Sequence, residues 1–107
     1  MSETDNLSTT QLIAALWKRN QPLILERLDQ LDAAAAAAHA GSLSEPQRME
    51  AESTAHKLSG SLGMFGFSQG TDFARELETE LRTQSPQPQR LTELSIALRA
   101  TLFPPAP

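Results

Sequence analysis

The sequence contains no cysteine, which excludes disulfide bonds and zinc sites built on thiolates. It also lacks a basic excess, since thirteen Asp and Glu against nine Lys and Arg give a net charge of −4. Nucleic-acid binding depends on basic side chains that neutralise phosphates, so we expect no nucleic-acid partner. The longest weakly polar run, Ala33–Ala38, is too short for a membrane span. The polar, acidic start MSETDNLSTT resembles neither a signal peptide nor a transit sequence. We therefore expect a soluble cytoplasmic protein.

No segment alternates with the two-residue period of a strand, and the apolar residues recur at helical spacing instead. Two capping boxes, Ser8 with Gln11 and Ser44 with Gln47, predict where helices begin. Ser68 is expected to cap a further helix. Substantial helices are predicted over residues 22–39, 45–64 and 90–102, with Gly41 and Gly66 as helix ends. The helix after Ser68 is expected to turn Phe73, Ala74, Leu77 and Leu81 inward.

Pro22 interrupts the first helical pattern. It either sits in the first turn of a new helix or kinks one long helix. We favour a short first helix followed by a second from about Pro22 to His39.

Four amphipathic helices joined by short loops predict an all-α, antiparallel, up-down four-helix bundle. Residues before Pro22 are expected to add a short N-terminal helix to this bundle, or to form the first part of a kinked first helix. We expect residues 1–7 to be a disordered lead-in, 8–103 to be the bundle and 104–107 to be a Pro-rich tail. A monomer is expected, because the apolar faces are all used inside the bundle. The start and end of the sequence suit a freestanding module or an N-terminal domain followed by a linker.

The most unusual stretch is Ala55–Phe67, AHKLSGSLGMFGF, which holds a histidine and three of the five glycines. A glycine inside a helix costs about 1 kcal/mol relative to alanine, so glycines here suggest a surface that a partner approaches closely. At 100° per residue, His56 lies about 140° from the apolar stripe and should face solvent. Four residues share its side of the helix: Glu52, Ser59, Gly60 and Gly63.

This stretch resembles the signature of histidine-containing phosphotransfer (HPt) domains. The positions that match the signature are His56, Leu58, Gly60, Ser61 and Gly66, and two more, Gly63 and Phe65, resemble one branch of the family. Many members carry lysine three residues after the histidine, where this chain has Ser59. Lys57 is the nearest cation in sequence, but it differs from that position by about 200° around the helix.

The resemblance implies a phosphorelay intermediary in two-component signalling. His56 would accept a phosphoryl group from an aspartyl phosphate on a receiver domain and pass it to another receiver. The partner would be the receiver of a response regulator or of a hybrid histidine kinase, and it would bring the Mg²⁺. The chain itself has no Walker A loop and no Gly-rich nucleotide loop, so we expect no kinase activity and no cofactor or metal of its own.

The residues around His56 receive expected roles in this scheme. Gly60 and Gly63 give the receiver room, and Met64 adds apolar contact. Ser59 hydrogen-bonds a phosphoryl oxygen in place of the usual lysine. Glu52, one turn before His56, orients the imidazole through its N–H.

Other residues are interpreted as ordinary parts of a bundle. His39 lies in the last turn of its helix, where a partly protonated imidazole suits the helix dipole. Trp17 and Phe65 are expected to fill the core or its end. Glu78 and Arg82 form an i,i+4 pair on a solvated face. Two alternatives to phosphotransfer stay open: an inactive HPt-like bundle that binds a receiver or kinase without being phosphorylated, and a purely structural helical module.

Overall fold

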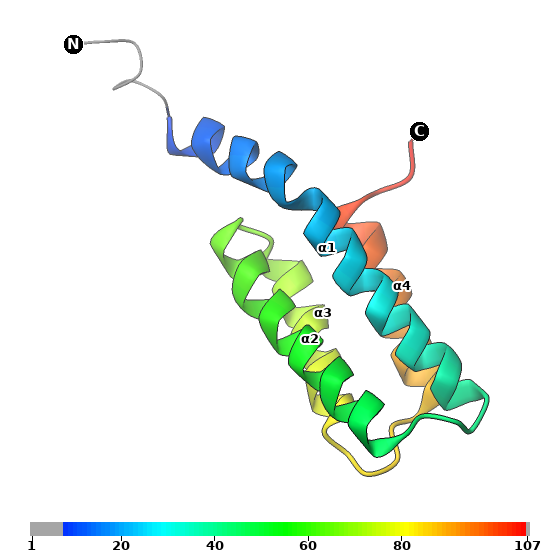
Figure 1. Ribbon diagram of the computed structural model, residues 1–107. Helices are drawn as coiled ribbons and strands as arrows, with labels where there is room; N and C mark the ends of the chain where they lie inside the picture. Colours follow the sequence, from blue (N-terminus) through cyan, green and yellow to red (C-terminus); the bar gives the residue numbers. More distant parts are fainter. Residues whose placement is uncertain (1–7, 107) are drawn as a thin grey trace.

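The structure is a computed structural model that describes residues 8–106, and within them it contains only helices and short loops (Figure 1). The four helices are α1 (Thr9–His39), α2 (Glu45–Met64), α3 (Ser68–Leu81) and α4 (Pro88–Leu102). The predicted all-α class is confirmed, and the bounds predicted for the helix that bears His56 agree with those of α2. No helix in the described part of the chain is long and apolar enough to cross a membrane. The predicted lead-in, residues 1–7, lies outside the described residues.

Capping boxes begin the first two helices, as predicted. The hydroxyl of Ser8 accepts a hydrogen bond from the Gln11 amide (3.0 Å), and the Gln11 side chain accepts one from the Ser8 amide (3.1 Å). Ser44 and Gln47 repeat the arrangement at 3.2 and 2.9 Å. Each box satisfies two backbone N–H groups that the first helical turn would otherwise leave without partners.

Glycines with positive φ follow the same two helices: Gly41 at +69° and Gly66 at +83°. In this left-handed region a Cβ atom would be crowded, so glycine is favoured. After Gly66, the amide of Phe67 donates to the carbonyl of Leu62 at 2.9 Å, the closing bond of a Schellman turn. Gly66 therefore ends α2 and turns the chain directly into α3.

The expected cap at Ser68 is wrong, because Ser68 is already the first residue of α3. The N-cap is Phe67, whose carbonyl accepts the first helical hydrogen bond from Thr71 at 2.9 Å. The turn at the end of α2 leaves no residue between itself and α3. The chain therefore enters α3 one residue earlier than the serine suggested.

The expectation of a separate helix before Pro22 is also wrong, since α1 is one helix of 31 residues with Pro22 inside it. The other alternative, one long helix interrupted by the proline, describes the structure, and the axis of α1 bends at this level in Figure 1. Proline removes one backbone hydrogen bond and kinks a helix. The helix continues because residues on both sides of Pro22 are packed: Ile24 is buried, and Trp17 lies among aromatic rings.

Each helix packs against its two neighbours in sequence order, and α4 closes the bundle against α1. With short loops, this gives the predicted antiparallel up-down arrangement (Figure 1). The core is built mainly from leucines, and its largest fully buried side chains are Ile24, Leu28, Leu58, Leu62, Leu77, Leu81, Leu91 and Leu98. One consequence matters for the site: α2 lies between α1 and α3, so its solvated side is bordered by both.

An aromatic cluster closes one end of the bundle. The ring of Trp17 lies 4.7 Å from that of Phe67 and 5.5 Å from those of Phe65 and Phe103, measured between centroids. These separations are typical of favourable aromatic pairs. Trp17 and Phe65 thus have the packing role predicted for them, although both stay partly accessible to solvent.

Gly60 inside α2 and Gly66 just after it should respond to alanine in opposite ways. Gly66→Ala forces a Cβ into the left-handed region and should lower the free energy of unfolding by about 1 kcal/mol. Gly60→Ala adds a Cβ in mid-helix with nothing within 4 Å, so it should raise the free energy of unfolding by about 0.5–1 kcal/mol. Urea denaturation followed by circular dichroism measures both. Equal effects of the two substitutions would contradict this assignment.

Candidate functional site

His56 stands on the solvated side of α2. Its side chain is 73% exposed, whereas Ala55 and Leu58 on the opposite side of the helix are fully buried. The helical phase predicted from sequence is thus the one observed. The imidazole is held on a rigid, core-packed helix and is open to a partner.

One side of the imidazole ring is held by a carboxylate from the next helix. The Nδ1 atom of His56 lies 2.9 Å from Oε2 of Glu78 on α3, and the Glu78 side chain is only 13% exposed. A carboxylate can only accept here, so Nδ1 carries the proton. That leaves the lone pair on Nε2 of the neutral ring, and among residues 8–106 this nitrogen has no hydrogen-bond partner. The arrangement presents Nε2 as a nucleophile.

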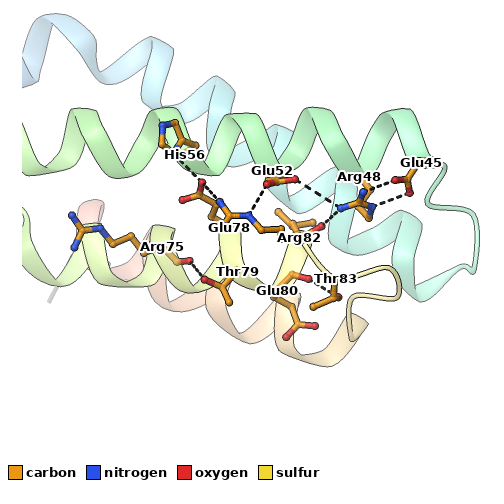
Figure 2. A network of polar contacts seen from close by, with 11 residues as sticks. Glu45, Arg48, Glu52, His56, Arg75, Glu78, Thr79, Glu80, Arg82 and Thr83 are labelled. Carbon is orange, nitrogen blue, oxygen red and sulfur yellow. Dashed lines mark hydrogen bonds and ion pairs between the residues drawn. The ribbon is translucent and has the colours of Figure 1, made fainter.

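Glu78 is the end of a chain of alternating charges that runs along the α2–α3 seam (Figure 2). Its Oε2 also accepts a hydrogen bond from Nη2 of Arg82 (2.8 Å), and Nε of Arg82 donates to Oε1 of Glu52 (2.9 Å). Oε2 of Glu52 lies 3.8 Å from Nη1 of Arg48, which is paired in turn with Glu45. The hydrogen bond to Glu52 and the charge of Glu78 raise the pKa of Arg82. The network therefore holds the Glu78 carboxylate through Oε2, the same oxygen that contacts His56.

Glu52 does not have the role that we expected from sequence. Its carboxylate is paired with Arg82 and Arg48, and Glu78 makes the predicted hydrogen bond to the imidazole instead. The expectation that Glu78 and Arg82 lie on an ordinary solvated face of α3 is also wrong for Glu78. The Glu78–Arg82 pair is present, but Glu78 is largely buried against α2. A helical wheel of α2 alone could not show a partner that comes from another helix.

Small residues border His56, and the fold itself does not require them. An added Cβ at Gly60 would meet nothing within 4 Å, and at Gly63 it would come no closer than 3.8 Å to Oγ1 of Thr71. Gly70 on α3 is different, because there a Cβ would lie 3.1 Å from Cδ2 of Leu102. Gly70 lets the side chain of Leu102 pack closely against α3, a role that sequence reasoning missed. Gly60 and Gly63 keep the surface beside His56 low.

The other predicted site residues lie around this low surface. The hydroxyl of Ser59 donates to the backbone carbonyl of His56 at 2.8 Å, so it points into its own helix. Lys57 is exposed, and Met64 is 69% exposed. Met64 borders a shallow hollow between α1 and α2 together with Leu16 and Leu23, which are 38% and 43% exposed. These two leucines extend the apolar surface and were not identified from the sequence.

A larger hollow lies elsewhere in the described chain, between α1 and α4, with a volume of about 640 Å³. It is on the side of the bundle opposite the α2–α3 seam (Figure 1). His39 borders it, as the last residue of α1, with Nε2 2.9 Å from Oγ1 of Thr92. Among residues 8–106 no three His, Asp or Glu side chains are grouped as metal ligands. The reactive geometry is at His56, away from this hollow.

The Glu78 contact makes a prediction about the neutral form of His56. The neutral ring should carry its proton on Nδ1, since the carboxylate fixes the tautomer. Glu78→Ala should shift the population towards the Nε2–H form. Long-range ¹H–¹⁵N NMR distinguishes the two tautomers. Glu76→Ala, which removes another carboxylate of α3, one paired with Arg90, is the control and should leave the tautomer unchanged.

Comparison with known proteins gives one match. No curated protein and no solved structure shows significant similarity to the chain. The family model described as the Hpt domain matches residues 11–102, which include all of α2, α3 and α4 and nearly all of α1. A match over most of the chain, together with the helical bundle that this family forms, shows that the chain belongs to the histidine-containing phosphotransfer (Hpt) domain family.

Proposed function

We propose that this chain carries a phosphoryl group on Nε2 of His56, accepting it from an aspartyl phosphate of one receiver domain and passing it to another. Hpt domains act as phosphotransfer modules in two-component phosphorelays and are not kinases. The observation that carries the proposal for His56 is its geometry. The ring is exposed on a rigid helix, and a largely buried carboxylate on Nδ1 leaves Nε2 free.

The transfer step is a displacement at phosphorus. The lone pair of Nε2 forms the N–P bond as the bond between phosphorus and the aspartyl oxygen breaks, and that electron pair returns to the aspartate as a carboxylate. Phosphoryl transfer needs in-line positioning and electrostatic stabilisation more than covalent help. Rigid presentation of Nε2 by α2 supplies the positioning.

Glu78 serves this step through the other nitrogen. When Nε2 bonds to phosphorus while Nδ1 keeps its proton, the ring becomes an imidazolium. The Glu78 carboxylate, 2.9 Å from Nδ1, stabilises that positive charge and holds the ring in one orientation. Arg82 keeps the carboxylate in place at 2.8 Å. Glu78 is thus a positioning residue for His56.

The surface beside His56 fits a partner that comes very close. Gly60 and Gly63 remove side chains next to the imidazole, while Met64, Leu16 and Leu23 provide exposed apolar area further along. Such an apolar patch on a monomer marks an interaction site. We infer that a receiver domain docks here, with its phosphorylated aspartate over His56 and its own Mg²⁺, in the cytoplasm.

The decisive experiment is transfer from a phosphorylated receiver. Incubation with ³²P-labelled receiver should give an acid-labile, base-stable label on the chain. His56→Gln should abolish the label, whereas His39→Gln, the other histidine, should keep it. Binding without any label would support the inactive, receiver-binding alternative. Neither binding nor label would favour a purely structural module.

A second experiment tests the low surface at Gly60. Gly60→Gln keeps the helix but places a long side chain beside His56, and it should weaken receiver binding by about tenfold or more, or about 1.4 kcal/mol. Ala100→Gln, at an exposed position of α4, is the matched control and should leave binding unchanged. Isothermal titration calorimetry gives both constants. Equal affinities for the two variants would exclude docking over Gly60.

A further inference from the structure

The ion-pair network beside His56 has an excess of negative charge, and phosphorylation would increase it. The network along the seam holds three carboxylates, from Glu45, Glu52 and Glu78, but only two guanidiniums, from Arg48 and Arg82. A phosphoryl group adds further negative charge within one helical turn of Glu52. Like charges at such distances repel, so a phosphorylated His56 needs a further cation.

The cations already in the network cannot supply that charge without exposing their own carboxylates. Both guanidiniums are committed to glutamates at hydrogen-bond distance, Arg82 to Glu52 and Glu78 and Arg48 to Glu45. Lys57 is the residue after His56 and so points about 100° away around α2. On the α1 side, Arg27 already donates to Ser61 at 3.4 Å, which leaves α3, the other wall of the seam, as a source of a further cation.

The register of α2 against α3 shows which residue that is. His56 faces Glu78, and four residues earlier on α2 Glu52 faces Arg82, four residues later on α3. Seven residues beyond His56, a Cβ on Gly63 would lie 3.8 Å from Thr71, seven residues before Glu78. The pairs before and after His56 on α2 therefore follow one antiparallel register with α3. In this register Ser59 faces Arg75.

Arg75 is placed and available for this role. It lies one helical turn before Glu78 on α3, about 4.5 Å along the axis, so its Cβ is on the same flank. Figure 2 shows its side chain extending along α3 away from Glu78, beside the part of α2 that follows His56. It is exposed, and its guanidinium forms no ion pair with any residue in 8–106. The small Ser59 and Gly60 leave its path to His56 open.

We propose that Arg75 binds the phosphoryl group carried by His56, supplying from α3 the positive charge that Ser59 does not supply from α2. The guanidinium donates hydrogen bonds to the non-bridging phosphoryl oxygens, a geometry that suits arginine. The Ser59 hydroxyl stays on the carbonyl of His56. This inference rests on His56 being the phosphoacceptor, and it identifies the residue that stabilises the transferred group.

The test measures single-turnover transfer from a phosphorylated receiver over a range of receiver concentrations up to saturation, which gives the maximal rate and the concentration for half-maximal rate. Arg75→Ala should lower the maximal rate by about tenfold or more, as the loss of one charged donor does at such sites. Arg75→Lys should retain most of the rate. Arg90→Ala, an arginine of α4 paired with Glu76, is the matched control and should match the parent. The double variant Ser59→Lys/Arg75→Ala moves the cation across the seam and should recover the rate.

The possible outcomes separate this inference from the proposed function. If the parent protein is labelled on His56 and Arg75→Ala reaches the same maximal rate, the inference is overturned while phosphotransfer stands. A change confined to the receiver concentration needed for half-maximal rate would assign Arg75 to docking and also overturn it. If the parent takes no label, the proposed function fails and the inference fails with it. Loss in Arg75→Ala with recovery in the double variant supports it.

Discussion

The site depends on the register in which α2 packs against α3. Ala55 and Leu58 of α2 and Ala74 and Leu77 of α3 are essentially inaccessible to solvent. Close packing of this kind resists sliding, since any shift would open voids or force overlaps. The ion pairs along the seam do not set the register, because Glu45 and Arg82 are largely exposed and ion pairs with an exposed member contribute little to stability. Core packing places Glu78 under His56, and the polar groups take their positions from it.

Because the site depends on how two helices pack, the sequence predicts its local features but not the contacts between the helices. Helix starts at Ser8 and Ser44 and the end at Gly66 follow from local capping rules, and the structure confirms them. The exposure of His56 follows from the phase of one helix. The partner of its imidazole does not, because Glu78 is 22 residues away and reaches the ring only through the packing of two helices. Within α2, Glu52 was the best candidate for the partner of the imidazole. The packing of α2 on α3 instead pairs Glu52 with Arg82 and places Glu78 against His56.

The continuity of α1 through Pro22 illustrates the same limit. Proline lowers the local preference for helix, which is all that the sequence shows. Whether the helix stops is decided by what lies beyond the proline. Here Trp17 packs on Phe65, Phe67 and Phe103, so the turns before Pro22 are held to the bundle and the helix continues with a bend.

If His56 is the phosphoacceptor, the hydrogen bond from its Nδ1 to Glu78 assists both acceptance and donation of the phosphoryl group. On acceptance, it keeps the proton on Nδ1 and directs the Nε2 lone pair outward. On donation, the ring that leaves phosphorus is neutral imidazole rather than an anion, because Nδ1 still carries its proton. The carboxylate stabilises the charged intermediate between these two events without giving up or taking a proton. Under the proposed function, such a module would favour neither direction by itself, and the phosphorylation state of the receivers would determine the direction of flow.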